Sequence, residues 1–197
     1  RAAARVLAAI GLQVEIARPA PGDPQPGRPL CCGRTYLSAG LVDRARAEAS
    51  RTVAALAPLV ARGVKVVGLE PACLLTMRDE FLSLGLGEAA QALACGALLF
   101  EEFLVRERAA GRSLPAFVKS PWSRALLHGH CHQQAFDTVS DVQQVLLWVP
   151  GLEVERAPPG RVETRAFEPR DVEAVEAGVV TRGQAVGGHV LRDHRVR

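Results

Sequence analysis

The fold class can be inferred from one stretch of the sequence, Val64-Lys65-Val66-Val67-Gly68-Leu69-Glu70-Pro71-Ala72-Cys73. The first six of these residues form a nearly continuous apolar run, which is typical of a strand buried on both faces of a parallel sheet. A predicted helix ends at Gly63 before this run, and another begins near Leu74 after it. Cys73 therefore stands just beyond the carboxyl end of a strand, where ligands bind in open α/β sheets.

The same succession of strand, cysteine and helix recurs along the chain. Ala125-Leu126-Leu127-His128 predicts a short strand, and Gly129-His130-Cys131-His132 follows it directly. Nearer the N-terminus, a loop rich in Pro and Gly at residues 19–29 leads to the pair Cys31-Cys32. Repeated strand–helix units with short connections predict an α/β protein with pseudo-repeated units, a mainly parallel sheet and cysteines at the carboxyl ends of strands.

The spacing of apolar residues predicts the remaining elements. We expect helices at residues 1–10, 41–62, 74–84, 87–97, 98–110 and 140–148, and further strands at residues 12–17 and 152–155. On the helix at 41–62, the outward-facing charged residues are predicted to be Arg44, Arg46, Glu48 and Arg51. Cys95 lies in mid-helix among Ala and Leu, which predicts a buried core thiol.

Length and composition exclude several classes of protein. The 197 residues, 48% hydrophobic and 23% charged, suffice for one globular domain or two small lobes. A net charge of +3 with dispersed Arg residues does not indicate nucleic-acid binding. The apolar runs fall far short of the ~20 residues of a membrane-spanning helix. Five cysteines without a signal peptide indicate a reducing, cytoplasmic setting, and a start at Arg1 within a predicted helix indicates an N-terminally truncated fragment.

The pair Cys31-Cys32, followed by Gly33, suits metal chemistry. Adjacent cysteines bridge each other poorly, because their Cβ vectors diverge. Gly33 supplies the backbone freedom for a tight turn around a bound ion or cluster. The alternative is that both cysteines are small buried hydrophobes at a strand end.

A single metal centre could gather four sulfurs, from Cys31, Cys32, Cys73 and Cys131. Thiolate and imidazole ligands suit iron–sulfur clusters and zinc. In an extended loop, alternate residues share a side, so His128, His130 and His132 could line one wall of the site as ligands or as donors to sulfur. The alternative for each histidine is an ordinary loop residue. Three acidic residues could serve acid–base chemistry or, more commonly, helix starts: Glu70, Asp79 and Glu80.

Three motifs together resemble the cysteine-rich "CCG" domain. They are Leu30-Cys31-Cys32-Gly33-Arg34, then Gly68-Leu69-Glu70-Pro71-Ala72-Cys73-Leu74-Leu75 with Arg78-Asp79-Glu80, and Leu127-His128-Gly129-His130-Cys131-His132-Gln133. The version most similar is the C-terminal iron–sulfur part of FAD-linked oxidases of the D-lactate and glycolate dehydrogenase type, and the domain also occurs in heterodisulfide reductase subunits. The likeness covers roughly residues 1–155, predicted as one CCG-type domain.

The resemblance implies an electron-transfer module that is not catalytic by itself. A flavin domain or partner subunit, carrying FAD, would oxidise a 2-hydroxy acid, and an iron–sulfur cluster of the 4Fe–4S class would pass electrons to a quinone or other acceptor. Such a protein is expected in the cytoplasm, at the inner face of the membrane. Carried over by position, the metal ligands are Cys31, Cys32, Cys73 and Cys131, with Gly33 as the turn residue at the cofactor. A zinc-binding structural or partner-docking lobe is the alternative.

The C-terminal segment departs from the family pattern. A second Cys-Cys-Gly should follow the strand near Val154, but the chain continues Arg156-Ala157-Pro158-Pro159-Gly160. Residues 156–197 contain no Cys, Ile or Lys and lack apolar periodicity. We predict that this tail is atypical, either out of register with the ancestral reading frame or disordered. A chain that binds no metal is then a third alternative.

Overall fold

A computed structural model of the chain describes residues 1–157, 173–176 and 189–192. The chain divides into two compact units. The first comprises Arg1–Phe100 with Val180–Arg197, and the second comprises Glu101–Val179. The boundary after Phe100 falls inside the stretch 1–155 that the sequence assigns to one domain.

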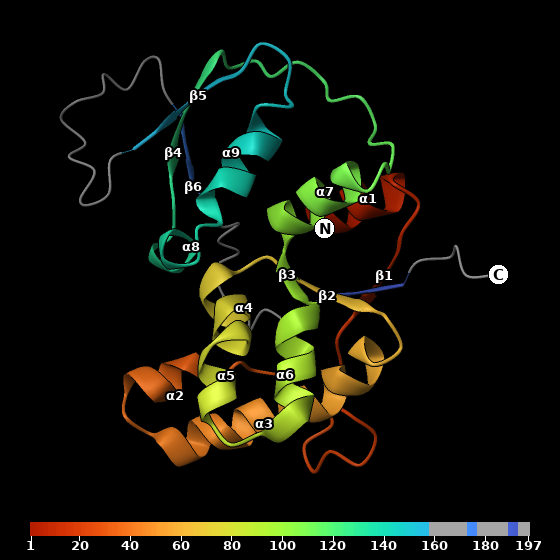
Figure 1. The fold of residues 1–197 in the computed structure, drawn as a ribbon, viewed down its shortest axis with the longest axis vertical. Helices are drawn as coiled ribbons and strands as arrows, with labels where there is room; N and C mark the ends of the chain where they lie inside the picture. Colours follow the sequence, from red (N-terminus) through yellow and green to blue (C-terminus); the bar gives the residue numbers. More distant parts are fainter. Residues whose placement is uncertain (158–172, 177–188, 193–197) are drawn as a thin grey trace. The chain divides into compact units, whose positions relative to one another are not determined.

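The first unit surrounds a four-stranded sheet (Figure 1). Its helices are α1 (Ala2–Ala9), α2 (Arg34–Ser38), α3 (Val42–Val60), α4 (Pro71–Arg78), α5 (Glu80–Ser83) and α6 (Gly87–Gly96). Its strands are β1 (Gln13–Ile16), β2 (Lys65–Gly68), β3 (Ala97–Leu99) and β7 (His189–Arg192). The strand order is β1-β7-β2-β3. Strands β2 and β3 are parallel, with Val67 opposite Leu98, whereas β7 runs antiparallel to β1 and β2.

The core of the first unit forms where helices α3 to α6 pack around the end of β2. Val66 and Val67 of β2 are fully buried, as the continuous apolar run predicts. Helix α3 buries the stripe Ala45, Ala49, Val53 and Leu56, which recurs at helical spacing. Figure 1 shows α4, α5 and α6 grouped beside α3. Helix α4, which carries Cys73, packs against α2, α5, α6 and the strands β2 and β3.

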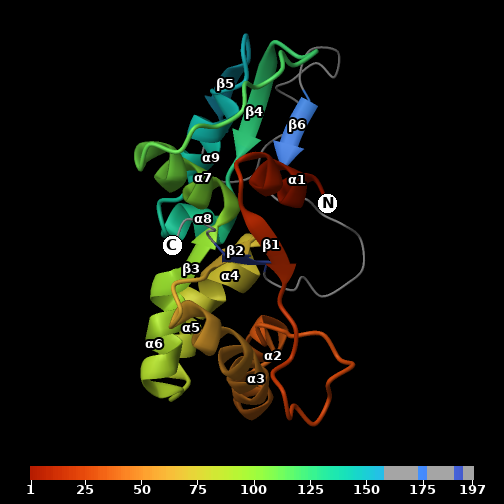
Figure 2. The same ribbon diagram turned by 90° about the vertical axis from the view of Figure 1, so that its right-hand side faces the viewer.

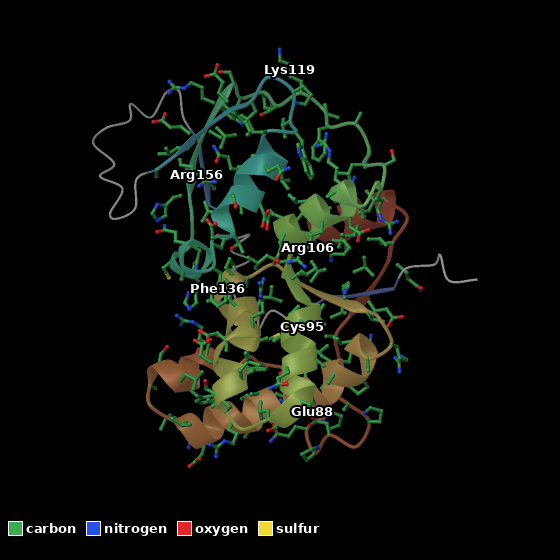
Figure 3. All side chains as sticks on the ribbon, viewed as in Figure 1. Glu88, Cys95, Arg106, Lys119, Phe136 and Arg156 are labelled. Carbon is green, nitrogen blue, oxygen red and sulfur yellow. The ribbon has the colours of Figure 1, made fainter. Side chains whose placement is uncertain are left out.

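Three details of the first unit differ from the sequence-based expectations. The expected helix at 74–84 is interrupted at Asp79, where α4 ends and α5 begins. The expected helix at 98–110 begins only at Phe100, because the buried residues Ala97–Leu99 pair with β2 as strand β3. Cys95 is exposed, so its prediction as a core thiol is wrong. Helix α6 turns Ala90, Leu93 and Gly96 inward, which leaves Cys95 on the outer face (Figure 3).

The second unit contains a three-stranded parallel sheet in the order β5-β4-β6 (Figure 2). Its strands are β4 (Arg124–His128), β5 (Glu153–Arg156) and β6 (Glu173–Glu176). Its helices are α7 (Phe100–Ala109), which crosses the unit boundary, α8 (Cys131–Ala135) and α9 (Val139–Leu146). A small core forms where Leu127 of β4 packs with Val139 and Val142 of α9.

The α/β class predicted from the sequence is confirmed, since strands and helices alternate and both sheets contain parallel pairs. Each of Cys73 and Cys131 lies in a helix that directly follows a strand, as predicted. Within the predicted tail, Glu173–Glu176 and His189–Arg192 are strands, and residues 158–172, 177–188 and 193–197 lie outside the described residues. Among the described residues, no helix is long and apolar enough to cross a membrane.

Candidate metal centre

Three cysteine thiols come together in the first unit. Cys32 Sγ lies 3.1 Å from Cys73 Sγ, although the two residues are 41 positions apart in the sequence. The thiol of Cys31 is hydrogen-bonded to that of Cys32. Cys32 is buried, and Cys31 and Cys73 are half-buried. The predicted convergence of these three cysteines is therefore present in the fold of this unit.

The start of helix α4 positions Cys73. Glu70 caps this helix: its carboxylate accepts hydrogen bonds from the amide of Ala72, at 3.1 Å, and from the amide of Cys73. Pro71 occupies the first turn, where its missing N–H costs nothing. Glu70 was predicted to serve either acid–base chemistry or a helix start, and the structure shows it at the helix start.

Gly33 shapes the turn that carries Cys31 and Cys32. Its φ of +76° lies in the left-handed region that other residues adopt at a cost. Its amide points to Cys31 Sγ at 3.4 Å. A Cβ atom at this position would lie 2.8 Å from the carbonyl oxygen of Ala45, so the turn can lie against α3 only with glycine there.

Thr52 fixes the backbone of the same turn. Its hydroxyl donates a 2.8 Å hydrogen bond to the carbonyl oxygen of Cys31, and the residue is 1% exposed. Thr52 is absent from the residues that the sequence patterns single out. The available signal was a threonine on the stripe of α3 that faces the core, where a hydroxyl needs a partner.

Arg51 secures the Pro- and Gly-rich loop that precedes the cysteines. Its guanidinium pairs with Asp23 at 2.9 Å and with Glu48 at 3.2 Å, and it donates to the carbonyl oxygen of Arg28 at 3.1 Å. Glu48 also pairs with Arg28 at 2.8 Å. The predicted outward position is wrong for Glu48 and Arg51, because the loop folds over this face of α3 and buries both side chains.

The crowded thiols favour their protonated forms. The hydrogen bond with Cys32, and then burial, raise the pKa of the Cys31 thiol far above its ordinary range. The bond from Cys31 lowers the pKa of Cys32, but the contact with Cys73 and burial outweigh it and raise that pKa to about 12. A bound metal cation would reverse this preference, because thiolates are its ligands.

A second group of potential ligands lies in the second unit, at the start of α8. Cys131 Sγ is 3.8 Å from His130 Nδ1 and 3.4 Å from His132 Nδ1. The two imidazole rings have centroids 5.1 Å apart. The chain turns into a helix here rather than remaining extended, so neighbouring residues converge and the group comprises His130, Cys131 and His132, without His128.

Hydrogen bonds hold this second group in place. The amide of His130 donates to Gln133 Oε1 at 3.2 Å, and Gln133 is buried. Gln134 Nε2 donates to the carbonyl oxygen of Gly129 at 2.8 Å. The amide of His132 donates to His130 Nδ1 at 3.2 Å. We refer to residues 129–134 as the ligand turn.

The six predicted metal ligands thus fall into two groups, Cys31, Cys32 and Cys73 in the first unit, and His130, Cys131 and His132 in the second. No family model, curated protein or solved structure matches this chain. The CCG resemblance and the use of Cys131 as a fourth ligand beside the first three therefore stay predictions. The two groups of potential ligands, one in each unit, are defined only by the distances between their side chains.

Proposed function

We propose that this chain is an iron–sulfur electron-transfer module of a flavin-linked 2-hydroxyacid dehydrogenase of the D-lactate or glycolate type. It would receive electrons from a flavin domain or subunit and pass them to a quinone or another acceptor, in the cytoplasm at the inner face of the membrane. The observation that supports this function best is that three cysteine thiols, those of Cys31, Cys32 and Cys73, come together in the first unit.

The donor set of the first unit suits such a cluster. Iron–sulfur clusters are held by cysteine thiolates, and they supply one-electron redox chemistry when bound. Cys31, Cys32 and Cys73 would be the ligands that this unit contributes. The Gly33 amide directed at Cys31 Sγ is the kind of donor that tunes a cluster, since hydrogen bonds to sulfur shift its reduction potential.

The surroundings of the three thiols also suit electron transfer. Cys32 is buried, which keeps water from the inner sulfur, whereas Cys31 and Cys73 are half-buried and lie near the surface of the unit. The bonds from Thr52 and Glu70 fix the backbone on both sides of the sulfur group. Rigidly held ligands reduce the structural rearrangement of the cluster and its surroundings when the cluster gains or loses an electron.

A specific observation favours zinc as the second candidate. Two sulfurs on one tetrahedral zinc ion, each about 2.3 Å from the metal, lie roughly 3.8 Å apart. The 3.1 Å between Cys32 Sγ and Cys73 Sγ is nearer to that separation than to a placement on separate metal atoms. In that case the first unit would be a structural or partner-docking lobe of an oxidoreductase complex.

Anaerobic purification followed by metal, sulfide and visible-absorption analysis tests the proposal. We expect iron and acid-labile sulfide in the wild-type chain, with a broad visible absorbance that Cys32→Ser abolishes and Cys95→Ser retains. Cys95 is the matched control because it is an exposed thiol outside both groups.

Zinc without colour that is lost in Cys32→Ser would support the zinc lobe instead. A folded wild-type chain whose metal content does not change in Cys32→Ser would contradict both functions of the first unit.

A further inference from the structure

We infer that His130, Cys131 and His132 form a separate binding site for a single divalent metal ion of the zinc class. The site lies wholly within the second unit and uses no thiol of the first. This assignment goes beyond the electron-transfer function, because it gives Cys131 to a different centre from Cys31, Cys32 and Cys73. It stands whether or not the first unit binds a cluster.

The distances between the ligand atoms match a tetrahedral ion. With zinc bonds of about 2.3 Å to sulfur and about 2.0–2.1 Å to nitrogen, a sulfur and a nitrogen ligand lie roughly 3.6 Å apart. Cys131 Sγ lies 3.8 Å from His130 Nδ1 and 3.4 Å from His132 Nδ1. All three ligand atoms lie within 4.8 Å of one another, so small side-chain rotations suffice to place one ion among them.

The donor set selects the class of metal. One thiolate and two imidazoles suit Zn²⁺ and its borderline-soft neighbours Co²⁺, Ni²⁺ and Cu²⁺, whereas Mg²⁺ and Ca²⁺ require oxygen ligands. Three protein ligands leave one tetrahedral position for water or a small exogenous ligand. Cys131 is exposed, so that position opens to solvent.

The ligand turn is already ordered without a metal. Gln133, which is 1% exposed, and Gln134 tie its two ends together through the amide of His130 and the carbonyl oxygen of Gly129. His130 Nδ1 accepts a hydrogen bond from the amide of His132, which assigns it the unprotonated lone pair that a metal needs. A metal ion at this nitrogen would take the place of the amide hydrogen, and both histidines are half-buried, so water can reach the released amide. An ordered turn lowers the entropy that binding costs.

Anaerobic titration with Co²⁺ tests the site in the 197-residue chain with Cys31, Cys32 and Cys73 all replaced by Ser. We expect one Co²⁺ per chain, a thiolate-to-cobalt charge-transfer band in the near ultraviolet, and intense visible bands of four-coordinate cobalt. Cys131→Ser should abolish the charge-transfer band. His130→Asn or His132→Asn should weaken binding beyond the ~10–100-fold that loss of an outer hydrogen-bonding partner costs. His128→Asn and Cys95→Ser are the matched controls and should change neither band nor affinity.

The same titration in the wild-type background guards against misfolding of the triple variant. There, Cys131→Ser should remove one Co²⁺ while leaving any iron and sulfide in place. Cys32→Ser should remove the iron and sulfide while leaving that Co²⁺ bound. A wild-type chain that holds no iron or sulfide but still shows the cobalt site would overturn only the electron-transfer proposal. A folded chain that shows no thiolate–cobalt band, or the same band after Cys131→Ser, would overturn the site inferred here.

Discussion

Gly33 is under two independent constraints. Its positive φ disfavours every residue with a Cβ atom, and the nearby backbone of Ala45 leaves no room for that atom. Gly40 shares the first constraint, with a φ of +72°, but has nothing within 4 Å of its Cβ position. The two glycines therefore form a matched pair that separates backbone conformation from steric fit.

Substitution of these glycines by alanine should have unequal effects on stability. We expect Gly40→Ala to lower the free energy of unfolding by about 1–2 kcal/mol, the cost of a left-handed residue with a Cβ. Gly33→Ala should cost about 2–5 kcal/mol, because overlap with Ala45 adds to the same conformational term. Urea denaturation monitored by circular dichroism measures both, and equal losses would contradict the steric role of Gly33.

Gly129 allows the ligand turn to approach helix α9. A Cβ atom there would lie 2.5 Å from Val139 Cγ2. We expect Gly129→Ala to destabilise the chain by about 1–3 kcal/mol through overpacking. In the double variant with Val139→Ala, the loss should be smaller than the sum of the two single losses by about 0.5–3 kcal/mol. Additive losses in a thermal-unfolding cycle would show that the two residues do not meet.

Helix α3 organises the first site although it supplies no sulfur ligand. One side of it presents Thr52 to the carbonyl oxygen of Cys31, and Arg51 and Glu48 to the loop that precedes the cysteines. A loop crowded with Pro and Gly forms few hydrogen bonds of its own, so side chains of the helix satisfy its carbonyl oxygens. The position of Cys31 and Cys32 consequently depends on this helix.

Removal of Arg51 should loosen the loop and the cysteine turn together. Arg51→Ala leaves the largely buried carboxylate of Glu48 with one cation fewer and three loop carbonyl oxygens without this donor. We expect a loss of about 2–4 kcal/mol in unfolding free energy, near the lower end for a broken buried ion pair. Limited proteolysis should show faster cleavage within residues 19–29. Arg44→Ala, an exposed change on the same helix, should leave both readouts unaltered.

The loop also makes stability depend on pH. The amide of Gln25 and then the guanidinium of Arg51 hold the pKa of Asp23 below its usual value. A carboxylate with a lowered pKa in the folded chain stabilises the fold above its unfolded pKa of about 3.9, and this contribution is lost as pH falls through the folded pKa. The stability difference between wild type and Asp23→Asn should therefore be present at pH 7 and shrink below about pH 4. A difference that stays constant across this range in urea titrations would show that Asp23 contributes nothing as a carboxylate.

Sequence patterns anticipated the elements with strong apolar signals and missed those decided by tertiary packing. The run at residues 64–69 and the stripe of α3 predict β2 and α3 directly, because burial sets both patterns. Strand β3 was missed since Ala97–Leu99 continues helical spacing and becomes a strand only beside β2. The convergence of Cys31 and Cys32 with Cys73 was predicted from strand ends. Thr52 was not identified and Arg51 was predicted to face outward, because nothing local in α3 shows that a loop will cover it.

The same local arrangement occurs in both units: a cysteine lies in the first turn of a helix that follows a strand. The surroundings of the two thiols differ. The thiol of Cys73 lies beside another cysteine thiol, whereas the thiol of Cys131 lies beside histidine imidazoles. All five cysteines lie within the described residues, so the exposure of each predicts how readily its thiol reacts with an alkylating reagent.

Native labelling with iodoacetamide should divide the five thiols of the metal-free chain into two classes. We expect Cys95 and Cys131, both exposed, to react first, and Cys31, Cys32 and Cys73 to react mainly after unfolding. Added Zn²⁺ should then protect Cys131 and leave Cys95 reactive. Peptide mass spectrometry assigns each label, and early labelling of Cys32 would contradict its burial.

Strand β7 lies between β1 and β2, so the sheet of the first unit joins residues from near both ends of the sequence. The ribosome makes the second unit between these two parts. Cys31, Cys32 and Cys73 all emerge early, with the helices that position them. The three cysteines and the helices that position them are consequently synthesised before residues 189–192, which complete the sheet.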